Sequence, residues 1–173
     1  MPPYILVGSY LTHASGFAWA KKMLGEPVVT MSYFGEGATA QSDFHSALNF
    51  ASIFHIPTIF FCENNQYAIS TPAKLQTATQ TFAEKGVAYG IHPEIVDGND
   101  PFAVYLVTKQ AVKRASQNNL PTLIEAVTYR LDPHTTAVGE IVKPIKEEYD
   151  DALRKDPILR MFKFLSVQAV DVF

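Results

Sequence analysis

The sequence predicts an α/β protein with a doubly wound, mostly parallel sheet and helices on both faces. Short apolar runs of strand length alternate along the chain with longer segments whose apolar residues recur every three or four positions. This alternation favours a parallel sheet, because each helix carries the chain back to the edge where the next strand begins. With 173 residues, 47% of them apolar, the chain can also bury the core that such a sheet needs.

The first half of the chain predicts a helix followed by a strand–helix–strand unit. The first helix covers residues 11–24 and ends at Gly25, a residue that commonly follows helices. Residues 28–34 and 59–62 are apolar runs and predict strands. Between them, one stripe at helical spacing predicts the crossover helix. The stripe consists of Phe44, Ala47, Leu48, Ala51 and Phe54.

The second half repeats the alternation. We expect a helix over residues 81–90, a strand over 94–97, and a helix through about residue 117 that opens with Asn99 or Asp100 as the cap and Pro101 in the first turn. Residues 121–129 predict the last strand. We interpret residues 1–173 as a single domain, in which residues 131–145 form a flexible loop and residues 146–166 form C-terminal helices.

Bulk composition argues against several classes of partner. A net charge of -3 provides no basic surface for nucleic acid, and no uncharged run is long enough to span a membrane. The single cysteine, Cys62, cannot form an intramolecular disulfide, which suits a reducing compartment. The first residues lack the basic and apolar regions of a signal peptide. We therefore expect a cytoplasmic protein, or one of the mitochondrial matrix if the source is eukaryotic.

Two polar segments follow the first two predicted strands and mark the candidate site. Gly35, Glu36 and Gly37 come after the first strand, and Asn64 and Asn65 end the second. Adjacent parallel strands end at the same edge of a sheet, and ligands bind in the crevice between their carboxyl ends. The sequence therefore predicts that Glu36 and Asn65 face each other across a ligand-binding crevice.

The same stretch resembles the thiamine-diphosphate motif, since an acidic residue between two glycines is followed by twenty-six residues and then Asn-Asn. Further motifs, in order, narrow the resemblance to the alpha subunit of the 2-oxo acid dehydrogenase first component, over about residues 2–165. These motifs are Asp43-Phe44-His45, Ala47-Leu48-Asn49-Phe50-Ala51, Asn64-Asn65-Gln66-Tyr67-Ala68-Ile69-Ser70-Thr71-Pro72, Val96-Asp97-Gly98-Asn99-Asp100, Pro121-Thr122-Leu123-Ile124-Glu125, Thr128-Tyr129-Arg130 and Pro133-His134-Thr135-Thr136.

This resemblance implies a thiamine diphosphate and Mg2+ site. It assigns the metal to Glu36, Asn65 and the main-chain carbonyl of Tyr67, oxygen ligands of the kind Mg2+ prefers. Small residues after Gly35 would let diphosphate approach the main chain at the start of the following helix. The remaining expected cofactor contacts are Val7 and Gly8, for the aminopyrimidine, Gly35, Gly37 and Ala38, for the diphosphate, and His134.

His134 is also the one catalytic residue that the resemblance implies. In the family the matching histidine lies on a flexible loop over the cofactor. An imidazole in that place can donate to phosphate oxygens or exchange a proton near neutral pH. We therefore expect His134 to reach the cofactor from the loop over residues 131–145.

The resemblance further implies thiamine-diphosphate-dependent oxidative decarboxylation of pyruvate or a related 2-oxo acid, with acyl transfer to a lipoyl group. The implied partners are a beta subunit, a second alpha chain and the lipoyl-bearing acyltransferase component. Branched-chain 2-oxo acids and acetoin are alternative substrates that the sequence does not separate from pyruvate.

Two departures from the family leave a non-catalytic alternative open. The family has Asp where this chain has Glu36, and the chain matches the family without its N-terminal third. A remnant that keeps the fold without binding Mg2+ is therefore the rival hypothesis. An unrelated Rossmann-type nucleotide binder is a third, but Ala40 stands where Gly-x-Gly-x-x-Gly needs its last glycine.

Overall fold

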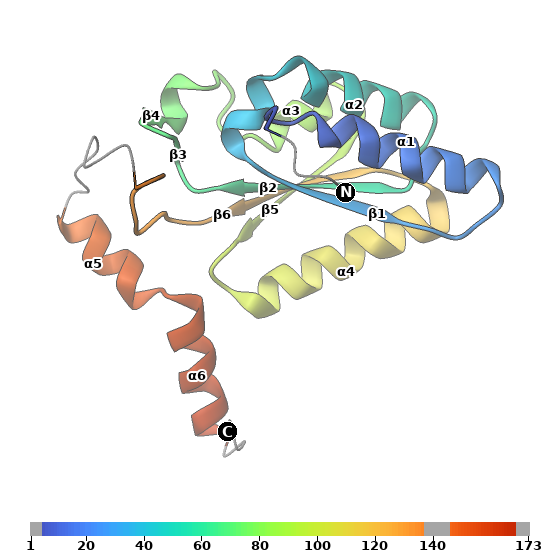
Figure 1. Ribbon diagram of the computed structural model, residues 1–173. Helices are drawn as coiled ribbons and strands as arrows, with labels where there is room; N and C mark the ends of the chain where they lie inside the picture. Colours follow the sequence, from blue (N-terminus) through green and yellow to red (C-terminus); the bar gives the residue numbers. More distant parts are fainter. Residues whose placement is uncertain (1–4, 137–145, 169–173) are drawn as a thin grey trace.

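The computed structural model describes residues 5–136 and 146–168 and confirms the α/β fold class. Its main sheet has four strands in the order β1-β2-β6-β5, all parallel (Figure 1). The strands are β1 Thr30–Gly35, β2 Thr58–Asn64, β5 His92–Asp97 and β6 Thr122–Val127, with β3 Tyr67–Ala68 and β4 Thr71–Pro72 forming a separate short hairpin. The helices are α1 Tyr10–Met23, α2 Ser42–Ile53, α3 Glu84–Val87, α4 Pro101–Asn118, α5 Lys146–Arg154 and α6 Pro157–Val167, with 3-10 turns η1 Glu36–Ala40 and η2 Ala73–Leu75.

Helices cover both faces of the sheet, as the alternation of elements predicts. In Figure 1, α1, α2 and α3 lie over one face and α4 lies over the other. The side chains of β2 alternate between the two faces of the sheet. Phe60 and Cys62 belong to the core that α1 and α2 cover, whereas Ile59 and Phe61 belong to the core that α4 covers. A strand that is buried on both faces reads as a continuous apolar run, which is the pattern of residues 59–62.

The expected helix over residues 81–90 is mostly wrong, because only the four residues of α3 are helical. Gly86 lies directly against the sheet, where an added Cβ would be 3.3 Å from Leu123 Cβ. Phe82 and Ala83 are buried on the way into α3. Packing therefore takes precedence over helical periodicity in this segment. Phe54 also departs from its predicted stripe, since it follows the end of α2 and is 44% exposed.

The start of α4 confirms the predicted cap. Asp100 Oδ1 accepts hydrogen bonds from the backbone N–H groups of Phe102 and Ala103, at 3.0 and 3.2 Å. Pro101 occupies the first turn, where the missing N–H costs nothing. The helix ends at Asn118 and is followed by the C-cap residue Asn119, which has a positive φ of 53°.

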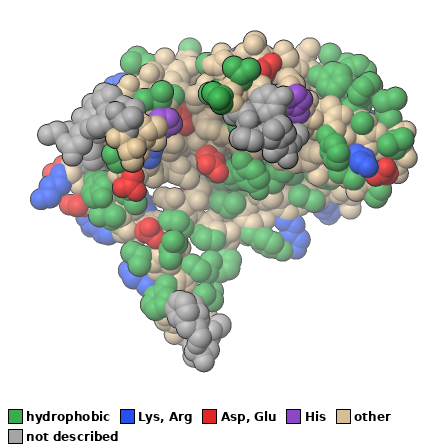
Figure 2. All heavy atoms as spheres, viewed as in Figure 1, with side chains coloured by type: hydrophobic (Ala, Val, Ile, Leu, Met, Phe, Trp, Pro, Cys, Tyr) green, Lys and Arg blue, Asp and Glu red, His purple; other side chains and the backbone are tan. Residues whose placement is uncertain are grey.

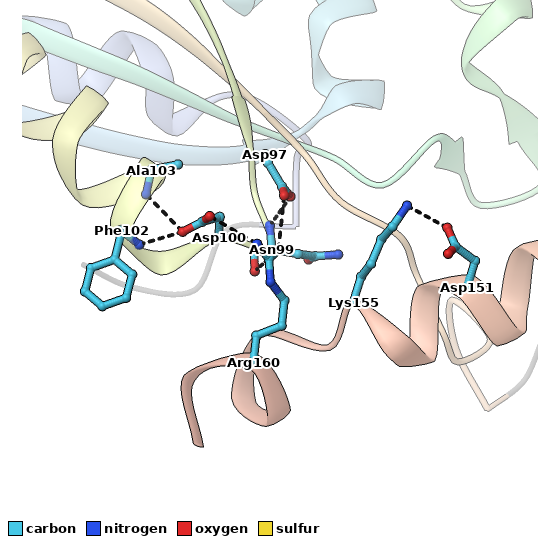
Figure 3. A network of polar contacts seen from close by, with 8 residues as sticks. All are labelled: Asp97, Asn99, Asp100, Phe102, Ala103, Asp151, Lys155 and Arg160. Carbon is cyan, nitrogen blue, oxygen red and sulfur yellow. Dashed lines mark hydrogen bonds and ion pairs between the residues drawn. The ribbon is translucent and has the colours of Figure 1, made fainter. Parts of the chain in front are cut away.

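The last helix, α6, contacts the β5–α4 turn through Arg160 (Figure 3). Arg160 donates to Asp97 Oδ2 and to Asp100 Oδ2, both at 3.1 Å. The rings of Phe164 and Phe102 pack edge to face beside this contact. Figure 2 shows apolar side chains at the surface of the projecting α6 segment. Within residues 5–136 and 146–168, no helix is long and apolar enough to cross a membrane.

Cys62 should make the stability of the protein depend on pH. Burial, with added repulsion from Glu125 and Glu36, raises the pKa of its thiol well above the ordinary value of 9.0. The folded chain therefore keeps a proton that the unfolded chain loses above this value, so stability present at lower pH is lost as the pH rises. Near pH 10 we expect the free energy of unfolding to fall by about 1.4 kcal/mol per pH unit from this group.

Urea unfolding of the wild type and Cys62→Ala at intervals from about pH 8 to pH 10 measures this effect. The comparison of slopes removes the contribution of other groups that titrate in the same range. Equal pH slopes in the two proteins would contradict the prediction.

Candidate functional site

The carboxyl ends of β1 and β2 bring Glu36 and Asn65 together, as the sequence predicts. Gly35 ends β1 and pairs in register with Glu63 of β2, so the residues that follow the two strands are neighbours. The Asn65 backbone N–H lies 3.4 Å from Glu36 Oε2. The two residues that the sequence places at these strand ends therefore lie side by side in the structure.

The Glu36 carboxylate is buried but weakly satisfied. Its residue is only 1% exposed, and its two oxygens accept long hydrogen bonds, from Asn65 N at 3.4 Å and from Gln76 Nε2 at 3.3 Å. A carboxylate removed from water needs strong compensating partners. Gln76 Nε2 also donates to the Thr71 carbonyl at 2.9 Å, so this amide is shared. Glu36 thus retains the capacity to bind a cation.

The loop after β2 begins beside this carboxylate and carries the other two candidate ligands, Asn65 and Tyr67. Asn65 Oδ1 accepts from the Tyr67 N–H at 3.1 Å, an interaction that orients the Asn65 side chain. Arg130 donates to the Tyr67 carbonyl at 3.0 Å and to the Ile69 carbonyl at 2.6 Å. Gln66 and Ile69 both have positive φ angles, 75° and 58°, which are strained for residues with side chains. The loop is therefore held in one conformation by contacts from outside it.

These residues fit a magnesium ion in the kind of atoms they provide. Glu36 and Asn65 supply a carboxylate and an amide oxygen, both hard ligands. The Tyr67 carbonyl is already an acceptor from Arg130, but a carbonyl oxygen has a second lone pair. Among the described residues there is no group of three or more His, Cys, Asp and Glu side chains that could hold a metal. A metal here would therefore be held by carboxylate, amide and carbonyl oxygens of the protein together with oxygens of the bound cofactor.

The structure also places two expected cofactor contacts near this edge. Gly8 is buried with φ of 82°, in a turn before α1, and a Cβ built on it would lie 3.7 Å from Ala38 Cβ. Val7 is 59% exposed beside it. The segment is a turn, in which the Gly8 carbonyl accepts a hydrogen bond from the Leu11 N–H at 3.1 Å.

A 3-10 turn separates β1 from the crossover helix. Gly37 and Ala38 lie inside this turn, η1, and α2 begins only at Ser42. Thr39 Oγ1 donates a hydrogen bond to the Glu36 carbonyl at 2.7 Å and accepts one from Lys85 Nζ at 2.8 Å. Burial lowers the pKa of Lys85. These contacts explain why the turn tightens before the helix begins.

Gly37 packs so closely on β3 that it should not tolerate a side chain. A Cβ at this position would lie 2.8 Å from Ala68 Cβ, below the separation that real Cβ atoms keep. We expect Gly37→Ala to displace β3 and lower the melting temperature, because close packing leaves no room for a methyl group. The double variant Gly37→Ala, Ala68→Gly should recover most of the loss. Thermal unfolding of the wild type, the two single variants and the double variant measures these changes in melting temperature. If the losses of the single variants simply added in the double variant, the contact between Gly37 and Ala68 would be refuted.

His134 is not brought to Glu36 or Asn65 within the described residues. Its side chain is exposed, in an irregular segment after β6. Residues 137–145 of the predicted flexible loop lie outside the described residues. Sequence reasoning missed Gln76 and Arg130, which contact the site directly. Arg130 belongs to the quoted Thr-Tyr-Arg motif, whereas no pattern in the sequence points to Gln76.

Fold and site together define an α/β protein in which a buried carboxylate and an asparagine lie side by side at the carboxyl ends of two parallel strands. The dehydrogenase E1 component family matches residues 1–170. The chain therefore belongs to the dehydrogenase E1 component family, which confirms the resemblance.

Two kinds of curated relative match at the same level. The 3-methyl-2-oxobutanoate dehydrogenase subunit alpha of Mycobacterium tuberculosis (strain ATCC 25618 / H37Rv) is 44% identical over 169 residues, which are 98% of this chain and 46% of the relative. The pyruvate dehydrogenase E1 component subunit alpha of Staphylococcus aureus (strain N315) is 44% identical over 167 residues, 95% of this chain and 45% of the relative. The chain thus spans a little under half the length of these relatives.

A solved structure supports the fold. It is an X-ray structure of a protein from Mycobacterium smegmatis assigned to the thiamin diphosphate-dependent enzymes. The TM-score is 0.55 at 21% sequence identity, over 72% of this chain and 23% of the other. At this identity the likeness concerns the α/β architecture alone.

Proposed function

We propose that this chain forms the thiamine diphosphate and Mg2+ half-site of a 2-oxo acid dehydrogenase alpha subunit. The observation that carries the proposal is the buried Glu36 carboxylate beside Asn65 at the carboxyl ends of two parallel strands. Family membership supports the cofactor, and the weakly satisfied carboxylate supports the metal. The proposed metal ligands are Glu36, Asn65 and the Tyr67 carbonyl.

The chain's own residues would hold the diphosphate rather than perform the carbon chemistry. Bound thiamine diphosphate supplies the nucleophilic carbon for decarboxylation of the 2-oxo acid. The main chain of Gly35, Gly37 and Ala38 would contact the diphosphate at η1, while backbone groups of Val7 and Gly8 would contact the aminopyrimidine. His134, exposed after β6, would donate to the phosphates or exchange a proton if its loop closes over the site.

The proposed reaction is oxidative decarboxylation of pyruvate or a related 2-oxo acid, with acyl transfer to lipoyl. Relatives named for pyruvate and for 3-methyl-2-oxobutanoate are equally similar, so the substrate is proposed as the 2-oxo acid class. The proposed partners are a beta subunit, a second alpha chain and a lipoyl-bearing acyltransferase component. A cytoplasmic location and a single-domain organisation remain predictions from sequence.

Calorimetric titration of thiamine diphosphate tests the proposal. The chain is titrated with excess Mg2+ and again with EDTA, alone and co-expressed with the beta-like chain if a neighbouring gene encodes one. We expect saturable binding that requires Mg2+. No binding by the folded chain with its partner present would favour the non-catalytic alternative, in which the fold persists without the metal site.

A further inference from the structure

Glu125 is a second buried carboxylate, and it lies beneath the metal-ligand loop. It is in β6, is 2% exposed, and is paired in register with Cys62 of β2. Its Oε1 accepts from Asn64 Nδ2 at 2.7 Å and its Oε2 accepts from the Ala83 N–H at 2.8 Å. Both bonds are short, as expected for a charged acceptor. Unlike Glu36, this carboxylate accepts a short hydrogen bond from a protein donor at each of its two oxygens.

Asn64 transmits this anchoring to the loop. While its Nδ2 donates to Glu125, its Oδ1 accepts from the Gln66 N–H at 2.9 Å. Only this orientation of the amide satisfies both neighbours, because the reversed amide would face an acceptor at Glu125 and a donor at Gln66. Glu125 therefore decides which way Asn64 points.

The anchored residue is one that needs support. Gln66 has a φ of 75°, a left-handed conformation that costs free energy for a residue with a Cβ. Asn65 lies between Asn64 and Gln66, so its side chain is aimed by the backbone that these two residues hold. Tyr67 then closes the turn by donating to Asn65 Oδ1.

The second hydrogen bond of Glu125, from the Ala83 N–H, leads to the segment that contains Glu36. Ala83 immediately precedes α3, and Lys85 of α3 donates to Thr39 Oγ1, which in turn donates to the Glu36 carbonyl. One buried carboxylate is thus linked through hydrogen bonds to the backbone around Asn65 and to the segment that supports Glu36.

We propose that Glu125 is a positioning residue that sets Asn65, through Asn64 and Gln66, for cation binding. As a deepening of the proposed function, this inference rests on Mg2+ binding at Glu36 and Asn65. Partners that orient metal ligands from outside the coordination shell typically contribute about 10- to 100-fold to metal affinity. We expect Glu125 to act at that level without touching metal or cofactor.

The first test is Glu125→Gln. A glutamine of the same shape can accept from either Asn64 or Ala83, but its NH2 group must then face the other donor. We expect the Kd of Mg2+-dependent thiamine diphosphate binding to rise by about 10- to 100-fold. The exchange of the Gln66 amide hydrogen with deuterium, followed by NMR, should accelerate as its hydrogen bond opens.

A polarity swap provides the rescue. In the double variant Glu125→Gln, Asn64→Asp, the glutamine amide donates to the new carboxylate, which still accepts from Gln66, while the glutamine oxygen accepts from Ala83. We expect the double variant to recover Gln66 protection and most of the affinity. Asn64→Asp alone places a carboxylate against that of Glu125. We therefore expect it to bind more weakly and to exchange the Gln66 amide faster than Glu125→Gln or the double variant. If Glu125→Gln fails to fold, the affinity and Gln66 protection of the double variant test the proposal instead.

A control separates positioning from general destabilisation of β6. Ile124→Val, fully buried on the opposite face of the same strand, should lower global stability but leave the Kd and Gln66 exchange unchanged. Wild-type Kd and exchange in Glu125→Gln would overturn the inference. If the wild type shows no Mg2+-dependent binding, the proposed function fails, whereas Gln66 exchange still decides the role of Glu125.

Discussion

Replacing Glu36 with Gln should abolish Mg2+-dependent thiamine diphosphate binding. The substitution keeps the shape of a side chain that is 1% exposed but removes the one carboxylate in the proposed ligand set. Loss of orienting partners alone costs metal sites about 10- to 100-fold, so loss of a ligand should cost more than about 100-fold. Calorimetric titration of the cofactor, with Mg2+ and with EDTA, measures the effect.

Two matched variants make this result interpretable. Glu36→Asp keeps the charge and has the residue found in the family, so it should bind with Mg2+ dependence preserved. Glu26→Gln makes the same chemical change at an exposed residue paired with Lys21, and should bind like the wild type. Unchanged affinity in Glu36→Gln, with the protein folded by circular dichroism, would remove Glu36 from the site.

Phe44→Ala should cause the largest loss of stability among single substitutions considered for this chain. Phe44 is fully buried on α2, and its ring packs against Phe34 of β1 with centroids 5.8 Å apart. Truncating a buried phenylalanine typically costs about 3 to 5 kcal/mol, from lost transfer free energy and the cavity that remains. Against a total stability of about 5 to 15 kcal/mol, this loss is large.

Phe17→Ala provides the comparison, because Phe17 is also on a helix but is 52% exposed. We expect it to change the free energy of unfolding by less than about 1 kcal/mol. Urea unfolding of both variants measures the difference. Similar losses in the two would show that Phe44 lacks the packing role inferred for it.

The sequence by itself determined most of the elements and the proximity of Glu36 to Asn65. Apolar runs such as residues 59–62 and the stripe around Phe44 specify strands and helices through local periodicity, which needs no knowledge of distant residues. Because consecutive parallel strands end at one edge, this local information also placed Glu36 near Asn65. The Asp100 cap of α4 is a further local feature that the structure confirms.

Tertiary structure alone decided what surrounds these proposed ligands. Strand β6 lies between β2 and β5, although it follows both in the chain, and this order brings Glu125 beneath Asn64 and Arg130 to the Tyr67 carbonyl. These pairs are separated by about sixty residues, and no local pattern encodes which strand will be the neighbour. The order depends on how helices fill both faces of the sheet. For the same reason α3 is short, since burial of Gly86 against Leu123 outweighs the helical preference of its sequence.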